Sequence, residues 1–317
     1  MLNSTICLTP RVSGVGGMVS FSHKLAAGLE ARGVHVTYDL DAAYDAVLVI
    51  GGTRQLAGLW RAKRRGVPIV QRLDGMNWLH RQKTKSFLPK LPTGARHYLR
   101  STYGNLLLAF IRRMATHIVY QSNFVVAWWE REHGATRVPY SVIYNGVDLE
   151  AYSPQGTHQR PSDLYRLLLV EGSLDGGYEM GLESAVGMAG LLADEYHLPI
   201  ELMVVGKVSE ELKASWDARS RVPINWAGLV PRADIPAIDR SAHLLYSSDL
   251  NAACPNSVIE ALACGLPVVA YDTGALPELV TPQAGRVVAY GGDPWQLDPP
   301  DVPALATGAA EVLTDQE

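Results

Sequence analysis

Cysteine is scarce in this chain of 317 residues, and the three cysteines, Cys7, Cys254 and Cys264, are far apart. An odd number of cysteines in apolar surroundings predicts buried thiols in a reducing compartment and argues against a disulfide framework. The nine histidines show no metal-ligand spacing such as H-E-x-x-H. We therefore expect no structural metal and no cofactor.

Long apolar runs are also missing. The run "LLLAFI" at 106–111 is among the longest and is followed by Arg112 and Arg113, whereas a membrane-spanning helix needs about 20 apolar residues. The first residues, "MLNSTICLTPR", lack a basic region followed by an apolar core, so no secretory signal is expected. These absences predict a cytoplasmic globular protein, with enough chain for two domains.

Acidic residues are rare in the first half of the chain. Residues 1–150 contain 19 Lys and Arg against 9 Asp and Glu, a balance of +10, whereas the remainder contains 9 against 23, a balance of −14. The basic residues cluster at 61–65, 81–85 and 112–113. A solvated helix face is the ordinary interpretation. The alternative is peripheral contact with anionic lipid on the inner face of a membrane, or with an anionic substrate. No nucleic-acid module is recognisable, so we expect no nucleic-acid partner.

Short apolar strands alternate with amphipathic helices along the chain. In the first half we expect strands at 5–10, 34–38, 46–52, 67–73, 117–122 and 141–146, and helices at 17–33, 53–65, 97–113 and 122–133. Residues 74–94 predict a mobile loop and 147–163 a linker. Further strands are expected at 165–172, 200–206, 223–228, 243–248 and 266–270, with helices at 179–194, 208–217 and 232–240 and another between Pro255 and Gly265.

This alternation, in two runs, predicts an α/β protein with two doubly wound parallel-sheet domains that face an interdomain cleft. We expect an N-terminal domain over 1–152 and a C-terminal domain over 153–317. Residues 302–317 begin a helix, and no crossover helix follows it, so the final crossover helices are expected to be missing.

Ligands of such sheets lie outside the carboxyl ends of the strands. Those positions hold Gly16-Gly17, Arg72–Asp74, Asn145-Gly146, Glu171-Gly172-Ser173, Gly228 and Asn256-Ser257. The dinucleotide fingerprint G-x-G-x-x-G fails because its third position is Val19, and no P-loop motif is present. Gly16 and Gly17 still let backbone approach a ligand, with a plain tight turn as the alternative.

The stretch "ACPNSVIEALACGLPVVA" (253–270) predicts a short helix with one carboxylate, Glu260. Ser257 and Glu260 have the spacing of a capping box, in which both are structural. Alternatively, the amides of Asn256, Ser257 and Val258 bind a phosphate at the positive end of the helix dipole, and Glu260 accepts hydrogen bonds from ribose hydroxyls. The stretch by itself leaves both interpretations open.

Five segments, taken in order, resemble the GT-B-fold glycosyltransferases, and family 4 of the retaining nucleotide-sugar transferases in particular. These segments are "GVGG" (14–17), "VYQSNF" (119–124), "VIYNGVDLEAYSP" (142–154), "WAGLVPRADIPAI" (226–238) and "PNSVIEALACGLPVVAYDTGALPELV" (255–280). The resemblance covers nearly the whole chain, and its last two segments are the specific ones.

The resemblance implies a metal-independent hexosyltransferase. Its donor would be a nucleoside-diphosphate sugar of UDP or GDP type, and its acceptor a glycan or a lipid-linked glycan, with the anomeric configuration retained. It also implies donor contacts from Gly16, Gly17, Gly172, Ser173, Leu229, Val230, Asn256, Ser257, Val258 and Glu260, and it makes Arg72 and Asp74 the candidate catalytic residues.

Three departures from the family pattern favour an alternative, a catalytically silent GT-B protein that binds a nucleotide or a glycan. The first acid of the E-x7-E motif falls on Ala252, with Asp249 or Asn251 as candidate substitutes. Ser173 and Met180 replace the Arg and Lys that stabilise the leaving diphosphate, so Arg72 or the 81–85 loop would have to supply a cation. The family's histidine after the fourth strand has no clear counterpart beside Arg72 and Asp74.

Overall fold

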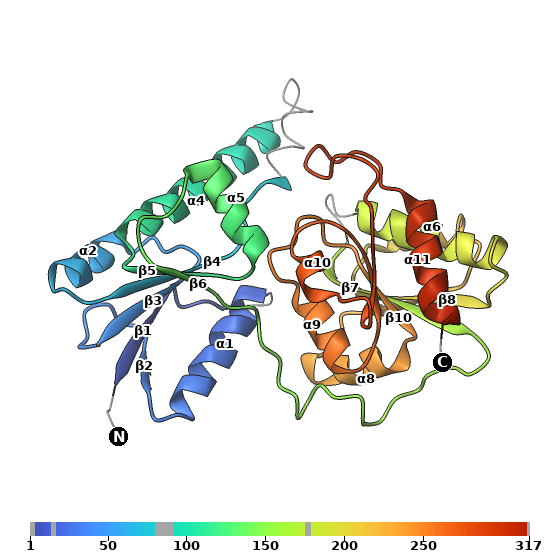
Figure 1. Ribbon diagram of the computed structural model, residues 1–317, viewed down its shortest axis with the longest axis horizontal. Coiled ribbons are helices and arrows are strands. Elements are labelled where there is room, and N and C mark those ends of the chain that lie inside the picture. Colours follow the sequence, from blue (N-terminus) through green and yellow to red (C-terminus); the bar gives the residue numbers. More distant parts are fainter. Residues whose placement is uncertain (1–3, 14–16, 80–91, 175–178, 316–317) are drawn as a thin grey trace. The chain divides into compact units, whose positions relative to one another are not determined.

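The computed structural model describes residues 4–13, 17–79, 92–174 and 179–315. The chain forms two compact units, unit 1 (Met1–Tyr144) and unit 2 (Asn145–Glu317). The predicted boundary after residue 152 thus falls inside unit 2. Each unit contains a six-stranded parallel sheet with helices on both faces (Figure 1), so the predicted fold class is confirmed.

Unit 1 has the strand order β2-β1-β3-β4-β5-β6. Its strands are β1 (Thr5–Thr9), β2 (His35–Thr37), β3 (Ala46–Ile50), β4 (Ile69–Leu73), β5 (His117–Tyr120) and β6 (Tyr140–Val142). Its helices are α1 (Gly17–Glu30), α2 (Leu56–Arg64), α4 (Pro92–Met114) and α5 (Asn123–His133). Helix α1 covers one face of the sheet, and α2, α4 and α5 cover the other (Figure 1).

Unit 2 has the strand order β12-β11-β10-β7-β8-β9. Its strands are β7 (Tyr165–Ser173), β8 (Ile200–Lys207), β9 (Ile224–Gly228), β10 (Leu244–Ser247), β11 (Val268–Tyr271) and β12 (Gly285–Val288). Its helices are α6 (Glu179–Asp194), α7 (Glu210–Asp217), the 3-10 turn η1 (Arg232–Asp234), α8 (Ile235–Ser241), α9 (Asn256–Ala263), α10 (Leu276–Leu279) and α11 (Val302–Thr314).

The sequence pattern did not predict β12 or α10. Each has four residues and neither is a continuous apolar run, because β12 begins with Gly285 and Arg286 and α10 contains Pro277 and Glu278. Strand β12 exists because it pairs in parallel with β11, from Val268 with Gly285 to Tyr271 with Val288. Tertiary pairing therefore decided this edge of the sheet.

The strands are apolar on both faces because helices bury both faces of a parallel sheet. In unit 2 one core lies under α6 and α11 and includes Leu182, Ala189 and Leu305. The other lies under α8 and α9, with Val258 and Ala261 against the strands. In unit 1 a core under α2 and α4 contains Leu59 and Ile111.

All three cysteines are buried and free of disulfides, as predicted. Burial raises the pKa of Cys7 and of Cys264 to about 11, so these two thiols are unreactive at neutral pH. The predicted mobile loop at 74–94 lies partly outside the described residues, and α4 already begins at Pro92. None of the described helices is both long enough and apolar enough to cross a membrane.

Candidate functional site

The strand order of unit 2 defines a switch point between β7 and β10. From β7 the chain first adds β8 and β9 on one side and then β10, β11 and β12 on the other. In doubly wound sheets the crevice beside such a point, at the carboxyl ends of the strands, is where ligands bind. Here Glu171 lies near the end of β7 and Ser248 directly follows β10, and Ser248 Oγ donates to Glu171 Oε1 at 2.5 Å.

The surroundings of Glu171 raise the pKa of its carboxyl group. Burial, together with the Asp249 carboxylate, raises the pKa of Glu171 to about 8, while the Ser248 hydrogen bond acts in the opposite direction. Burial also raises the pKa of Asp249. A protonated Glu171 lowers the negative charge at the switch point, where an anionic ligand would otherwise be repelled.

We expect Glu171→Gln to flatten the pH dependence of stability. The folded-state pKa of Glu171 lies above its ordinary value of 4.5, so its stabilising contribution is complete below about pH 4.5 and is lost as pH rises through about 8. The wild-type chain should therefore lose roughly 2–4 kcal/mol of unfolding free energy relative to the variant between pH 5 and pH 9.

Urea unfolding of both chains at a series of pH values measures this difference. Asp239, whose pKa burial raises to about 7, contributes a slope of the same sign, but it is present in both chains and cancels in the comparison. Parallel stability curves for wild type and variant would show that Glu171 is already ionised.

The predicted capping box is wrong. Helix α9 has Pro255 at its N-cap and no side-chain cap among the described residues, so Ser257 lies inside the first turn. The first intrahelical bond runs from Ile259 N to Pro255 O at 3.4 Å. The amides of Asn256, Ser257 and Val258 precede it and point out of the helix end. This arrangement suits an anionic group, while the Val258 side chain is fully buried in the core.

Glu260, one turn into α9, forms an ion pair with Arg232 of η1, at 3.6 Å between Arg232 Nη2 and Glu260 Oε1. The Glu260 side chain is 14% exposed and that of Arg232 is 46% exposed. The Tyr152 hydroxyl lies beneath this pair, where burial and the Glu260 charge raise the pKa of Tyr152. Sequence reasoning assigned no role to Arg232, and only the packing of η1 against α9 brings it to Glu260.

The loop before α9 is held from two sides. Asn145 Nδ2 donates to Cys254 O at 2.8 Å, so the predicted linker motif anchors the entrance of the helix. Gly274 approaches from the other side, and Ala275 N donates to Ala252 O at 2.8 Å. Asn251, in this loop, has a positive φ of 53° and is 4% exposed. Within the described chain its buried Nδ2 has no hydrogen-bond partner.

The other donor-site candidates lie along the same sheet edge. Gly172 and Ser173 are exposed at the end of β7. Leu229 and Val230 follow β9, and Leu229 is 68% exposed. Met180 lies near the start of α6, where its sulfur accepts a contact from Tyr290 Oη at 3.7 Å. A thioether thus occupies the position at which the family resemblance leads one to expect a lysine.

Unit 1 has its own switch point, between β1 and β3. There Thr9 Oγ1 and Thr53 Oγ1 lie 3.2 Å apart. Gly17 is the first residue of α1, and Gly16 lies outside the described residues, as do residues 81–85.

Arg72 and Asp74, at the end of β4, lie close to each other. Arg72 is 5% exposed, with its guanidinium carbon 3.5 Å from the centre of the Phe21 ring. Burial raises the pKa of Asp74, and the Arg72 charge opposes the shift. In the described part of the chain no cluster of His, Cys, Asp and Glu could hold a metal ion.

The GT-B fold consists of two Rossmann-like units, and both units of this chain are of that type. The family described as "Glycosyl transferases group 1" matches residues 166–315, and "Glycosyltransferase Family 4" matches residues 40–151. The lipopolysaccharide core biosynthesis mannosyltransferase LpcC of Rhizobium leguminosarum bv. viciae is 30% identical in an alignment of length 272 that covers 74% of this chain and 68% of LpcC. The chain therefore belongs to the GT-B glycosyltransferases.

Solved structures share the fold at low sequence identity. Sucrose-phosphate synthase of Thermosynechococcus elongatus matches with a TM-score of 0.66 and 16% identity, over 98% of this chain and 90% of that one. WaaG, a glycosyltransferase of lipopolysaccharide biosynthesis, gives 0.64 and 17%, over 98% and 90%. Anabaena HepE in complex with UDP and glucose gives 0.59 and 16%, over 98% and 94%.

Proposed function

We propose that the chain transfers a hexosyl group from a nucleoside-diphosphate sugar, of UDP or GDP type, to a glycan or lipid-linked acceptor with retention of configuration. The observation that carries this proposal is the uncapped start of α9, with a carboxylate one turn into the helix, beside the switch point of unit 2. The amides of Asn256, Ser257 and Val258 would receive the diphosphate. Glu260 would accept hydrogen bonds from the ribose hydroxyls.

The sugar and the base would lie on either side of the diphosphate. Gly172 and Ser173 leave room at the end of β7, and Asn251 Nδ2 can donate to a sugar oxygen in place of the missing first acid. The backbone of Leu229 and Val230 would meet the base. The family resemblance assigns donor contacts in unit 1 as well, to Gly17 at the start of α1 and to Gly16, which lies outside the described residues.

Departure of the nucleoside diphosphate would be assisted by the α9 amides, since dipoles fixed at the site of developing charge stabilise a transition state most effectively. The acceptor would attack from the same face, with no protein nucleophile. Arg72 and Asp74 are the candidate catalytic groups of unit 1. The Arg72 guanidinium stacks on the Phe21 ring.

Relatives support the donor class in general terms. HepE was solved with UDP and glucose, and LpcC is a mannosyltransferase. The second candidate function, a silent nucleotide-binding protein, is favoured by one observation. Ser173 and Met180 stand where the family resemblance implies the two cations that stabilise the diphosphate, and Met180 packs against Tyr290.

A thermal-shift panel of UDP, GDP, ADP and their sugar conjugates, followed by turnover assays, tests the proposal. One nucleoside diphosphate should raise the melting temperature. At a hundredfold excess over its Kd, this ligand should stabilise the folded state by about 2.7 kcal/mol. Its sugar conjugate should then be consumed with an acceptor, and NMR of the product should show the anomeric configuration of the donor. Binding without turnover would favour the silent protein, and no binding would overturn both interpretations.

A further inference from the structure

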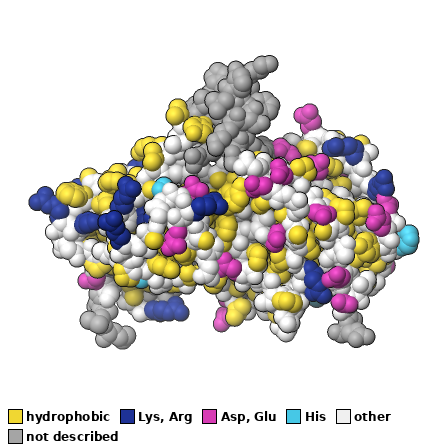
Figure 2. Space-filling view, turned by 45° about the horizontal axis from the view of Figure 1, so that its top comes forward, with side chains coloured by type: hydrophobic (Ala, Val, Ile, Leu, Met, Phe, Trp, Pro, Cys, Tyr) yellow, Lys and Arg dark blue, Asp and Glu magenta, His cyan; other side chains and the backbone are white. Residues whose placement is uncertain are grey.

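Unit 2, which receives the anionic donor in the proposed function, is itself acidic. Residues 151–317 contain 9 Lys and Arg against 23 Asp and Glu. Figure 2 shows Asp and Glu side chains spread over the part of unit 2 turned to the viewer, with few Lys and Arg among them. A diphosphate that binds in such surroundings needs a cation close by, both to be held and to leave.

Nearly all basic side chains of unit 2 have a partner within the described chain. Five of the nine Lys and Arg residues form ion pairs with carboxylates, and three donate to backbone carbonyl groups. The ninth is Lys207, for which the described residues supply neither an ion-pair nor a hydrogen-bond partner. Its side chain is exposed at the carboxyl end of β8. Lys207 is therefore available to a ligand in a way that the other eight are not.

Strand pairing places Lys207 beside Ser173. The two residues are register partners in the parallel pair of β7 and β8, and neighbouring strands of a sheet lie about 4.8 Å apart. Ser173 is exposed at the carboxyl end of β7, beside the switch point of unit 2. It is also the position at which the family resemblance implies an arginine. Lys207 thus brings an ammonium group, on a flexible four-carbon stem, to the neighbourhood of the missing guanidinium.

The backbone of Lys207 is fixed against β7. Leu174 N donates to Lys207 O at 3.0 Å, and the pairing of the two strands has an irregular register just before Ser173. Gly206 has a φ of +147° and lies so close to β7 that a Cβ would be 2.3 Å from Glu171 O. Only glycine allows this close approach. The local backbone therefore determines that Lys207, and not a neighbour in sequence, lies opposite Ser173.

We propose that Lys207 is the cation of unit 2 that contacts the diphosphate of the donor. This inference rests on the proposed function and deepens it. Strand β7 lies between β10, which leads into α9, and β8, so the diphosphate would lie over the end of β7, between the α9 amides and Lys207. The role of Lys207 is electrostatic. It offsets the charge on the terminal phosphate when the bond to the sugar breaks and the electron pair of that bond stays on the phosphate oxygen.

Two other basic residues considered for the site fit this role less well. Arg232 is paired with Glu260, and Arg72 of unit 1 stacks on the Phe21 ring. Lys207 breaks no such contact with a described residue when it turns to a ligand. With this cation in place, the loss of the family's Arg and Lys no longer favours a catalytically silent protein.

Isothermal titration with UDP, UMP, GDP and GMP tests the assignment. The mono- and diphosphate of one nucleoside share the base, the ribose and the first phosphate, so the ratio of their Kd values reports on the second phosphate. The test variant is Lys207→Met, which removes the charge, and Lys207→Arg restores a cation. The matched control is Lys213→Met, because Lys213 is the other lysine of unit 2 and its ammonium group pairs with Glu210 at 2.7 Å. The melting temperature of each chain shows that it is folded.

The Lys207→Met variant should bind the diphosphate about 10- to 100-fold more weakly than wild type, the range for a hydrogen bond to a charged group, and the monophosphate nearly as well. Lys207→Arg should recover most of the diphosphate affinity, and Lys213→Met should match wild type. If Lys207→Met keeps the wild-type ratio of the two Kd values, with both affinities kept or both reduced, Lys207 does not contact the diphosphate, while the proposed function stands. If wild type binds none of the four nucleotides, the proposed function fails and the role of Lys207 with it.

Discussion

Replacing Glu260 by alanine should lower the affinity for the nucleoside diphosphate by about 10- to 100-fold, the equivalent of about 1.5–3 kcal/mol for hydrogen bonds to a charged group. The proposed function gives this carboxylate the two ribose hydroxyls. Without ligand, the substitution should lower the stability of the fold only slightly, because the Arg232 partner is 46% exposed and exposed ion pairs contribute little to stability. Isothermal titration with the nucleotide identified by the thermal-shift panel measures the effect.

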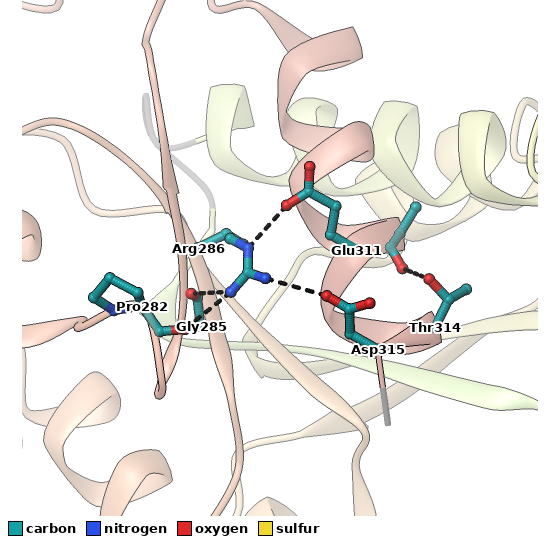
Figure 3. A network of polar contacts seen from close by, with 7 residues as sticks. Pro282, Gly285, Arg286, Glu311, Thr314 and Asp315 are labelled. Atoms are coloured by element: carbon teal, nitrogen blue, oxygen red, sulfur yellow. Dashed lines mark hydrogen bonds and ion pairs between the residues drawn. The ribbon is translucent and has the colours of Figure 1, made fainter. Parts of the chain in front are cut away.

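The control is an arginine–carboxylate pair of the same unit without a proposed ligand role. Arg286 Nε donates to Glu311 Oε2 of α11 at 2.8 Å, and Asp315 completes the network (Figure 3). Glu311→Ala removes the same functional group at a side chain that is 53% exposed. It should leave nucleotide affinity unchanged. Equal affinities for wild type and Glu260→Ala would remove Glu260 from the site and leave it only its contact with Arg232.

Replacing Gly274 by alanine should destabilise unit 2 by about 3 kcal/mol or more. Its φ of +63° is costly for a residue with a Cβ. A Cβ would also lie 2.4 Å from Ala252 N and 2.5 Å from Ala252 O. These are backbone atoms, and Ala275 N donates a hydrogen bond to Ala252 O. The loop before α9 must therefore move to make room for the Cβ. Chemical unfolding should show the lower stability, and nucleotide titration should show a lower affinity.

The variant Gly66→Ala separates the cost of the positive φ from the cost of the steric clash. Gly66 has a similar φ of +75°, but a Cβ there meets nothing within 4 Å. This variant should lose only about 1–2 kcal/mol, the cost of the left-handed backbone alone. If the two glycine variants prove equally stable relative to wild type, Gly274 does not clamp the loop, and the proposed geometry of residues 249–252 is wrong.

The fold was accessible from the sequence because its signals are local. Apolar strands buried on both faces leave continuous runs such as "AVLVI" at 46–50, and the helices between them carry apolar residues at helical spacing. Strands and helices alternate in this way both before and after the segment 147–163. The common fold for such a pattern is a pair of doubly wound sheets. Strand β12 was not predicted because its sequence, "GRVV", is not a continuous apolar run, and its pairing with β11 cannot be read from local sequence.

The sequence by itself determined the two doubly wound domains, the strand ends that hold Glu171, Asn145 and Asn256, and the carboxylate at Glu260. Tertiary structure alone decided which side chains meet there. Arg232 forms an ion pair with Glu260, and Ser248 donates a hydrogen bond to Glu171, whose pKa is raised by burial. The physical reason is that chemistry at a site depends on distance and burial between segments far apart along the chain, whereas sequence patterns report only on neighbours within a few turns.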